Sequence, residues 1–305
     1  MTTAEGLLQA GTFAHDALFY QGRDEYAREV CSFVLQGVSA GEPVLVAVPG
    51  RRLDLVRGAL GEAGQAVSFA DMAVLGRNPA RIIPAIRRFT DSRRPHRTRF
   101  VGEPVWAGRS PAETAEATRH EALINALCPY DASGLGPAVL ADARRTHPRL
   151  VQDGARRPSA DYSGTAVARA IGGQPLPSPP PGARSTAFGE QDLPALRDQV
   201  SRRAVQEGIS PSRAQDLVIA VHEIAANTVV HAGGAGILRI WRDGLSLVCE
   251  IADDGRNTDP LAGRHPDSPG DDSGHGLRIA HELCDLVQLR SGPWGTTVRL
   301  HILAG

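Results

Sequence analysis

Three polar residues recur at helical spacing near the middle of the C-terminal half. Glu223, Asn227 and His231 stand four residues apart, within and just after a stretch, 212–230, that has the apolar pattern of an amphipathic helix. Residues at this spacing share one face of a helix. A carboxylate one turn from a carboxamide suits a base beside a Mg²⁺ ligand, because Mg²⁺ prefers oxygen donors. Alone the pattern is weak, since such residues usually form a solvated face.

A second acidic segment follows about twenty residues downstream. The strand expected over 245–252 runs into Asp253, Asp254 and Gly255. A carboxylate held at a strand end can accept a hydrogen bond from the exocyclic amine of adenine, and a glycine beside it lets the backbone approach a ring. By itself, Asp-Asp-Gly is more typical of a turn.

A glycine-rich segment then opens another amphipathic helix. Gly274, His275, Gly276 and Leu277 stand at its start, where bare amide groups and the helix dipole favour a phosphate. The preceding residues, 259–273, are rich in Gly, Pro and Asp, which predicts a mobile lid that nucleotide would order.

The composition restricts how phosphate could be held. The 33 basic residues are all Arg, and the formal net charge is −1. A chain without lysine has no Walker A loop, no protein-kinase strand lysine and no Schiff-base chemistry. A phosphate site here must therefore work through backbone amides or arginine.

In this order, the segments resemble the N, G1, G2 and G3 boxes of the GHKL ATPase superfamily, and 190–303 most resembles the bacterial anti-sigma factor serine kinases. The resemblance implies an α+β domain of the Bergerat type, with helices on one face of a mixed sheet, that binds ATP and Mg²⁺. Glu223 would be the general base and Asn227 the Mg²⁺ ligand. The other binding residues that it implies are His231, Asp253, Gly255, Gly274, His275, Gly276 and Leu277, with Thr296 and Thr297 lining the base pocket.

One position departs from the family pattern. The G1 box usually reads Asp-x-Gly-x-Gly, and Asn257 stands at the second glycine. Asparagine tolerates left-handed backbone geometry better than most residues. The departure therefore weakens the case for nucleotide binding without refuting it, and it leaves open whether kinase activity is retained.

A run of prolines and glycines divides the chain. Residues 172–183 can join neither a helix nor the interior of a sheet, so they predict an extended linker between domains at 1–171 and 184–305. The first domain alternates strand-like and helix-like segments, which is typical of an α/β fold with a mainly parallel sheet. Its expected helices span 23–38, 51–63, 79–90 and 111–127.

The first domain resembles the MEDS sensory domain over about 13–150, and the family implies a RecA-like core without P-loop catalysis. The segments that carry the resemblance are 15–20, 102–106, 119–125, 128–131 and 146–148. The family implies no particular ligand, although an unknown small ligand is expected. Residues that could line its pocket, with ordinary capping and core roles as the alternative, are His15, Tyr20, Glu103, Trp106, His120 and Glu121.

Together these features favour an ATP-dependent serine/threonine kinase that regulates a sigma factor by phosphorylating an antagonist protein. One alternative is a non-catalytic module in which ATP switches affinity for a partner. A histidine kinase ranks last, because 184–211 offers one helix and no phosphoacceptor histidine.

Other signals concern location and partners. The four cysteines are far apart with no C-x-x-C pair, so their spacing predicts neither zinc nor a disulfide. Met1–Thr12 lacks a signal-peptide pattern, and no apolar run is long enough to cross a bilayer. The arginine-rich run at 87–99 lacks interleaved aromatics and reads as a solvated surface. We expect a cytoplasmic protein without direct nucleic-acid or membrane contact; a homodimer remains open.

Overall fold

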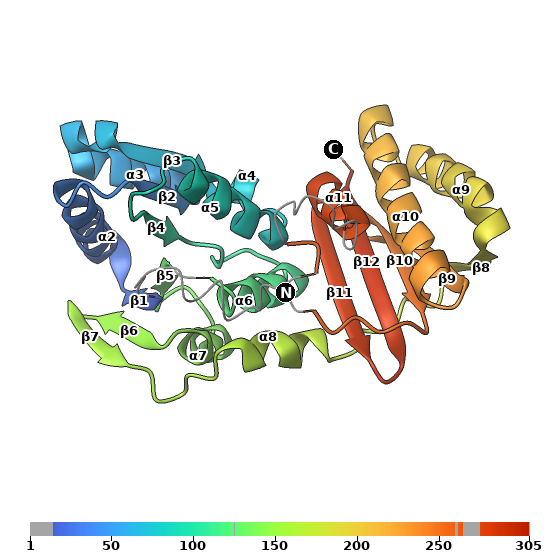
Figure 1. Ribbon diagram of the computed structural model, residues 1–305. Helices are drawn as coiled ribbons and strands as arrows, with labels where there is room; N and C mark the ends of the chain where they lie inside the picture. The colour runs from blue at the N-terminus through green and yellow to red at the C-terminus, as the bar shows by residue number, and fades with distance from the viewer. Residues whose placement is uncertain (1–14, 125, 260–261, 265–274, 305) are drawn as a thin grey trace. The chain divides into compact units, whose positions relative to one another are not determined.

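The computed structural model describes residues 15–124, 126–259, 262–264 and 275–304. The chain divides into two compact units, Met1–Ala168 and Arg169–Gly305 (Figure 1). Gly274 lies outside the described residues, as do residue 125, which ends the segment 119–125, and most of the expected lid.

The first unit is built on a seven-stranded sheet of order β3-β2-β4-β5-β1-β6-β7. Its neighbouring strands run parallel, except that β6 and β7 form an antiparallel edge. The mainly parallel sheet predicted from the alternating pattern is therefore confirmed. The strands are β1 (Asp16–Tyr20), β2 (Val44–Val48), β3 (Val67–Asp71), β4 (Arg99–Gly102), β5 (Leu127–Asp131), β6 (Arg149–Gln152) and β7 (Ala155–Pro158).

Each of the four predicted helical segments contains a helix, while α4, α7 and α8 were not predicted. The segment expected to be helical over 111–127 ends as a helix at Glu121, because Leu127 already belongs to β5 and pairs with β1. Its start agrees with the prediction: Ser110 and Glu113 form a reciprocal capping box. The helices are α2 (Gly22–Ser39), α3 (Gly50–Leu60), α4 (Met72–Leu75), α5 (Ile82–Asp91), α6 (Pro111–Glu121), α7 (Pro137–Thr146) and α8 (Thr165–Gly172).

The second unit is built on a five-stranded sheet of order β11-β12-β10-β9-β8. Every neighbouring pair is antiparallel, so the sheet is more regular than the mixed one expected. Strand β8 (Arg184–Gly189) had no counterpart in the sequence-based prediction. The other strands are β9 (Ala235–Asp243), β10 (Ser246–Asp253), β11 (Leu286–Gly292) and β12 (Gly295–Leu303).

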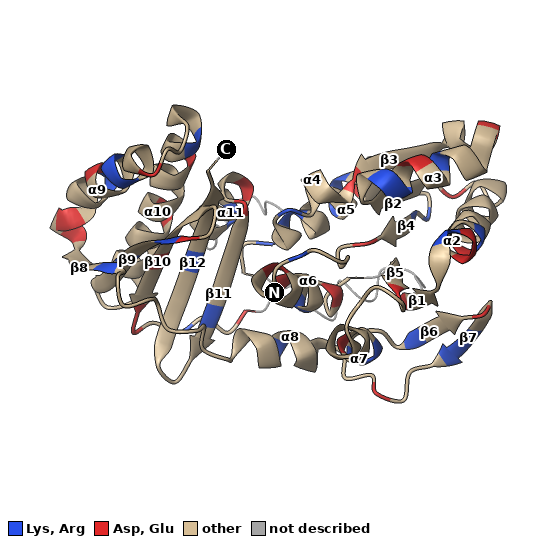
Figure 2. Ribbon diagram, turned by 180° about the vertical axis from the view of Figure 1, so that it is seen from behind, with Lys and Arg blue, Asp and Glu red and all other residues tan. Residues whose placement is uncertain are grey.

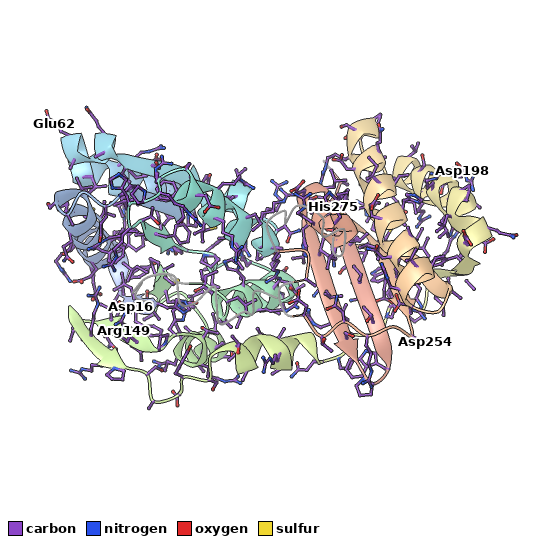
Figure 3. All side chains as sticks on the ribbon, viewed as in Figure 1. Asp16, Glu62, Arg149, Asp198, Asp254 and His275 are labelled. Atoms are coloured by element: carbon purple, nitrogen blue, oxygen red, sulfur yellow. The ribbon has the colours of Figure 1, made fainter. Side chains whose placement is uncertain are left out.

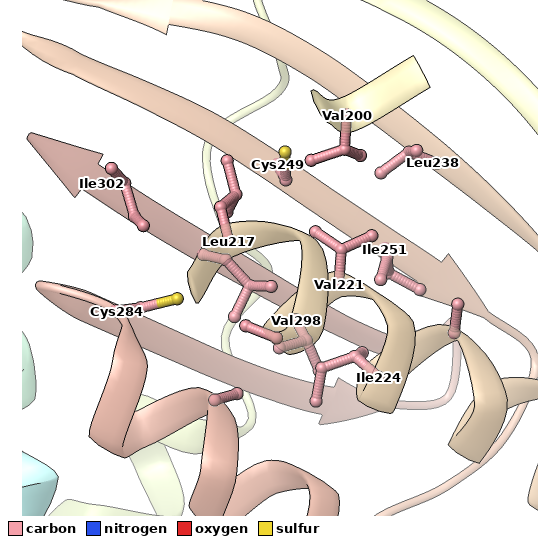
Figure 4. Close-up of a cluster of buried hydrophobic side chains, with 14 of the residues drawn as sticks. Val200, Leu217, Val221, Ile224, Leu238, Cys249, Ile251, Cys284, Val298 and Ile302 are labelled. Carbon is pink, nitrogen blue, oxygen red and sulfur yellow. The ribbon is translucent and has the colours of Figure 1, made fainter. Parts of the chain in front are cut away.

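Three helices cover one face of this sheet: α9 (Leu193–Gln206), α10 (Pro211–His231) and α11 (His275–Leu283). Figure 4 shows the core between them, where Leu217 and Ile224 of α10 meet Ile251 and Val298 of the strands. Alternate strand residues face this core because side chains alternate across a sheet. The expected arrangement, helices on one face only, is confirmed.

The opposite face of the sheet carries a buried ion-pair cluster. Glu250 of β10 is 3% exposed and accepts hydrogen bonds from Arg239 at 3.0 Å and from Arg299 at 2.5 and 3.0 Å. The guanidinium of Arg299 also lies 4.9 Å from the ring centroid of Trp241 and donates to the carbonyl of Pro177. Residues 173–183 form neither helix nor strand, and this contact ties them to the sheet.

Acidic and basic residues are interspersed over both units (Figure 2). In the arginine-rich run, Arg94 pairs with Asp91, while Arg97 and Arg99 pair with Glu42. No helix in the described part of the chain is long and apolar enough to span a bilayer.

The cluster around Glu250 should be essential to the stability of the second unit. Replacing Glu250 with Ala leaves two half-buried or buried guanidinium groups without their partner, which costs about 3–5 kcal/mol in comparable sites. We expect a correspondingly lower urea midpoint, followed by tryptophan fluorescence. Glu282→Ala, at an exposed position of α11, is the control and should leave the midpoint unchanged. Equal midpoints for the two variants would contradict this prediction.

Candidate functional site

The candidate site of the second unit is organised by the long helix α10. Its core side presents Leu217, Val221 and Ile224 to the sheet, and this packing fixes the helix in rotation. Glu223 and Asn227 lie at the border of that buried side and are each partly exposed. The helix therefore holds a carboxylate and a carboxamide one turn apart, where a bound molecule can reach both.

The first turn of α11 lies directly against this pair. A Cβ atom at Gly276 would lie 2.8 Å from Nδ2 of Asn227 and 3.0 Å from Oε2 of Glu223. A real Cβ does not approach polar atoms this closely, so only glycine fits without a shift. The first described turn of α11 is thus brought beside the carboxylate and the carboxamide.

Asp253 is fixed at the end of β10 by two donors. The hydroxyl of Thr228 donates to Oδ2 at 2.7 Å, and the amide of Gly255 donates to Oδ1 at 2.9 Å. A carboxylate has about four acceptor positions, so Asp253 can still accept from a further donor. Thr228 is five residues from Glu223, about 7.5 Å along the helix axis. The carboxylate of Asp253 and the start of α11 therefore both lie against α10, beside Thr228 and Glu223 respectively.

The strand β12 closes this end of the site. Thr296 is the antiparallel partner of Asp253, and its hydroxyl donates to the carbonyl of Gly255 at 2.8 Å. Gly295 has φ +105°, and a Cβ there would overlap the carbonyl oxygen of Asp253. The geometry of the β10 end thus depends on a glycine in the neighbouring strand.

The structure also describes the surroundings of three other predicted residues, Thr297, His231 and His275. Thr297 follows Thr296 and, by the alternation along β12, faces the side of the sheet that carries Arg299. The side chain of His231 is exposed at the last turn of α10. His275 is also exposed, and its Nε2 lies 3.0 Å from Nη2 of Arg278.

Leu277 has a packing role. It is buried in the core of the unit, and a Cβ at Gly263 would lie 2.7 Å from its Cγ. Gly263 has φ +70° and so adopts a conformation that favours glycine. Leu277 therefore anchors the described part of the expected lid, residues 262–264, to α11.

Asn257 does not need the left-handed conformation that the family pattern suggests. Asp153 is the one non-glycine residue with positive φ in the described part of the chain. The amide of Asn257 donates to Ser291 Oγ at 2.9 Å, and its Oδ1 accepts from the amide of Asp259 at 3.0 Å. The substitution therefore introduces no backbone strain here.

The sequence reasoning missed three residues of the site. Thr228 holds Asp253, Ser291 links Asn257 to Thr296 through a 2.9 Å hydroxyl contact, and Gly295 gives room to the β10 end. The only sequence signal for Thr228 is its position beside Asn227. The role of Ser291 depends on strand pairing between β11 and β12 and has no local signal.

In the first unit, the residues proposed to line one pocket separate toward opposite edges of the sheet. Tyr20 and Glu103 lie where β1 and β4 end, with Arg52, which pairs with Glu103 and lies 5.3 Å from the ring centroid of Tyr20. Burial raises the pKa of Tyr20. His15 precedes β1 and lies near Glu121, about 16 Å away from Tyr20 along the strand.

The other two proposed lining residues are Trp106 and His120. Trp106 stacks with Arg109, whose guanidinium carbon is 4.0 Å from the ring centroid. His120 is fully buried in α6.

Comparisons with known proteins match two separate regions of the chain. Residues 14–148 match the family model of the MEDS domain, described as a methanogen/methylotroph, DcmR sensory domain. Residues 188–302 match the model of the histidine kinase-like ATPase domain. No curated protein matches the chain.

One solved structure with a matching region contains the RsbU and RsbW domains of a Mycobacterium tuberculosis protein. It is 18% identical with a TM-score of 0.30, and the match covers 39% of this chain. The match spans 32%, about a third, of the length of that structure. The first unit is therefore similar to the MEDS sensory domain, and the second unit is similar to the histidine kinase-like ATPase domain.

Proposed function

We propose that the second unit binds ATP with Mg²⁺ and transfers phosphate to a serine or threonine of an antagonist protein, under control of the MEDS domain. The observation that carries the proposal is the close approach of Gly276 to Glu223 and Asn227. It brings an anion-binding helix end beside a residue that can act as a base and one that can bind a cation.

The end of β10, where Asp253 contacts Thr228 of α10, fits an adenine ring. Asp253 already accepts two hydrogen bonds, which hold its carboxylate in place, and it retains acceptor capacity for an exocyclic amine. Thr296 supports the same segment through Gly255. The site requires no lysine, in agreement with a chain that has none.

The donor set also fits Mg²⁺. The carboxamide oxygen of Asn227 would supply one oxygen ligand, and Mg²⁺ keeps several waters and binds nucleotide phosphates for the rest. When bound, the ion supplies charge neutralisation of the phosphate groups. The amides at the start of α11 add to that effect without a charged side chain.

Glu223 is the residue placed to handle the proton of an acceptor hydroxyl. Its carboxylate lies within one turn of Asn227 and beside the start of α11. Phosphoryl transfer depends mostly on positioning and electrostatics, so a base that orients a hydroxyl in this place is sufficient. The partners, a sigma factor and its antagonist, are proposed from the sequence resemblance. The alternative of an ATP-switched binding module shares the nucleotide site and omits the transfer.

A methyl group at position 276 should interfere with nucleotide binding. Gly276→Ala places a Cβ 2.8 Å from Asn227 and 3.0 Å from Glu223, so α11 or these side chains must shift. We expect Mg·ATP affinity to fall about tenfold, which corresponds to about 1.4 kcal/mol. Titration calorimetry measures the effect. Gly58→Ala is the matched control, since a Cβ at that helical position meets nothing within 4 Å. The same affinity in both variants would argue against phosphate binding at this helix end.

Asp253→Asn should weaken binding of adenine nucleotides while leaving the fold intact. The amide side chain presents a donor where adenine also presents one, and loss of a charge-assisted hydrogen bond costs about 1.5–3 kcal/mol. We expect an affinity for ATP at least about tenfold lower. Asp243→Asn, at an exposed strand end, should bind like the wild type. Unchanged affinity in Asp253→Asn would remove the adenine assignment.

Transfer itself is tested with ATP labelled at the γ-phosphate and each candidate antagonist protein. We expect labelled phosphoserine or phosphothreonine with the wild-type chain and a loss of about 10²–10⁴-fold in Glu223→Ala, the usual contribution of a general base. Glu190→Ala, at an exposed position, should retain activity.

Tight ATP binding without any transfer to those proteins would support the ATP-switched binding module instead.

A further inference from the structure

Four buried side chains of the first unit bring metal-ligating atoms together. His15, Glu121, Cys128 and His147 each offer one ligand atom, and these atoms all lie within 4.8 Å of one another. All four residues are buried, with His147, Glu121 and Cys128 fully enclosed. This cluster, named here the His-Cys-Glu cluster, plays no part in the proposed nucleotide site.

The topology of the sheet creates the cluster. His15 immediately precedes β1, Cys128 is the second residue of β5, and His147 lies two residues before β6. Strand β1 pairs in parallel with both β5 and β6, so these three residues meet at the amino-terminal edge of the central strands (Figure 1). Glu121 reaches them from the last position of α6.

The hydrogen bonding of His147 fixes which ring nitrogen faces the cluster. Nδ1 lies 2.8 Å from the carbonyl oxygen of Ala143, and a carbonyl can only accept, so Nδ1 carries a hydrogen. In the neutral ring, Nε2 then has a lone pair. Nε2 lies 3.0 Å from Oε2 of Glu121, so either one proton or one metal cation can bridge these two atoms.

His15 is arranged in a similar way. Its Nε2 is buried without a hydrogen-bond partner and lies 4.0 Å from Oε2 of Glu121. The centroids of the His15 and His147 rings are 4.0 Å apart. The buried Nε2 of His15 is therefore a potential ligand atom that faces the same carboxylate as Nε2 of His147.

Neighbouring groups support this arrangement without competing for an ion. Asp16, next to His15, is engaged by Arg149 at 2.7 Å and Arg156 at 3.0 Å; Figure 3 shows Asp16 beside Arg149. The hydroxyl of Tyr130 donates to Oε2 of Glu121 at 3.3 Å. A backbone carbonyl behind one histidine and a donor on the carboxylate are the outer contacts that orient metal ligands in proteins.

We propose that the His-Cys-Glu cluster binds one Zn²⁺ ion through Nε2 of both histidines, the Cys128 thiolate and the Glu121 carboxylate. Zinc prefers four such N, S and O ligands in a tetrahedron, with mutual separations of about 3.5 Å. The cluster reaches this spacing if its widest pairs close by about one ångström.

The charge balance supports this choice of ion. One thiolate and one carboxylate neutralise the two charges of Zn²⁺, so the loaded site is neutral in its buried surroundings. Binding releases the proton of the Cys128 thiol to solvent, with no redox change. The four protein ligands leave no open position, so the ion has a structural role that ties three strands to α6.

The test uses the full-length chain without a histidine tag. After dialysis against buffer that contains Zn²⁺ and then against metal-free buffer, mass spectrometry should find one zinc per chain. Loading with Co²⁺ instead should give visible d–d absorption of tetrahedral intensity and a thiolate-to-cobalt charge-transfer band. Cys128→Ser should abolish the charge-transfer band, and His147→Gln should lower metal affinity at least about tenfold.

Two matched variants serve as controls. Cys31→Ser replaces another buried cysteine of the same unit, and His96→Gln replaces an exposed histidine. Both should retain one zinc and the cobalt spectrum of the wild type. If the cluster variants fail to fold, the wild-type spectrum and stoichiometry still decide the question.

A wild-type chain that retains no zinc and shows no thiolate-to-cobalt band would overturn the proposal. The cluster would then be a buried ion pair of protonated His147 with Glu121. Retention of the band in a folded Cys128→Ser variant would also overturn it, because the thiolate ligand would lie elsewhere.

Discussion

The approach of α11 to α10 is the constraint on which the second unit depends. Gly276 leaves room for no side chain between the two helices, and the contact places peptide amides beside Glu223 and Asn227. The packing of α10 on the sheet makes this possible, because it fixes which residues face the core and which remain at its border. A nucleotide site can therefore arise from helix packing and backbone, in a chain that has no lysine to offer.

Much of this could be predicted from the sequence because the main signals are local. Helix periodicity located α10, and the order of the glycine and acidic segments located the β10 end and the start of α11. The sheet edge strand β8 was missed because its residues, mostly exposed, show no clear alternation. Thr297 was grouped with Thr296, although neighbours on a strand face opposite sides. Strand pairing, which decides the partner of Asp253, has no local signal at all.

In the first unit, even more of the structure depends on strand pairing that the local sequence does not predict. The strand β1 is buried along its whole length and alternates too little to be recognised by pattern. Once it is placed between β5 and β6, residues that are more than a hundred positions apart, such as His15 and Cys128, become neighbours. Cysteine spacing gave no metal signal because each ligand comes from a different segment. The sheet also separates His15 from Tyr20, which the sequence had assigned to one pocket.

Strand β12 supports a different part of the second unit on each of its two faces. Thr296 supports the nucleotide side, and Arg299, three residues on, fastens the carbonyl of Pro177 on the reverse side. The proline-rich segment is thus bound to one face of β12, and the opposite face of the same strand contacts the end of β10. A substitution that displaces β12 is therefore expected to affect both the β10 end and the attachment of the proline-rich segment, because both depend on the same strand.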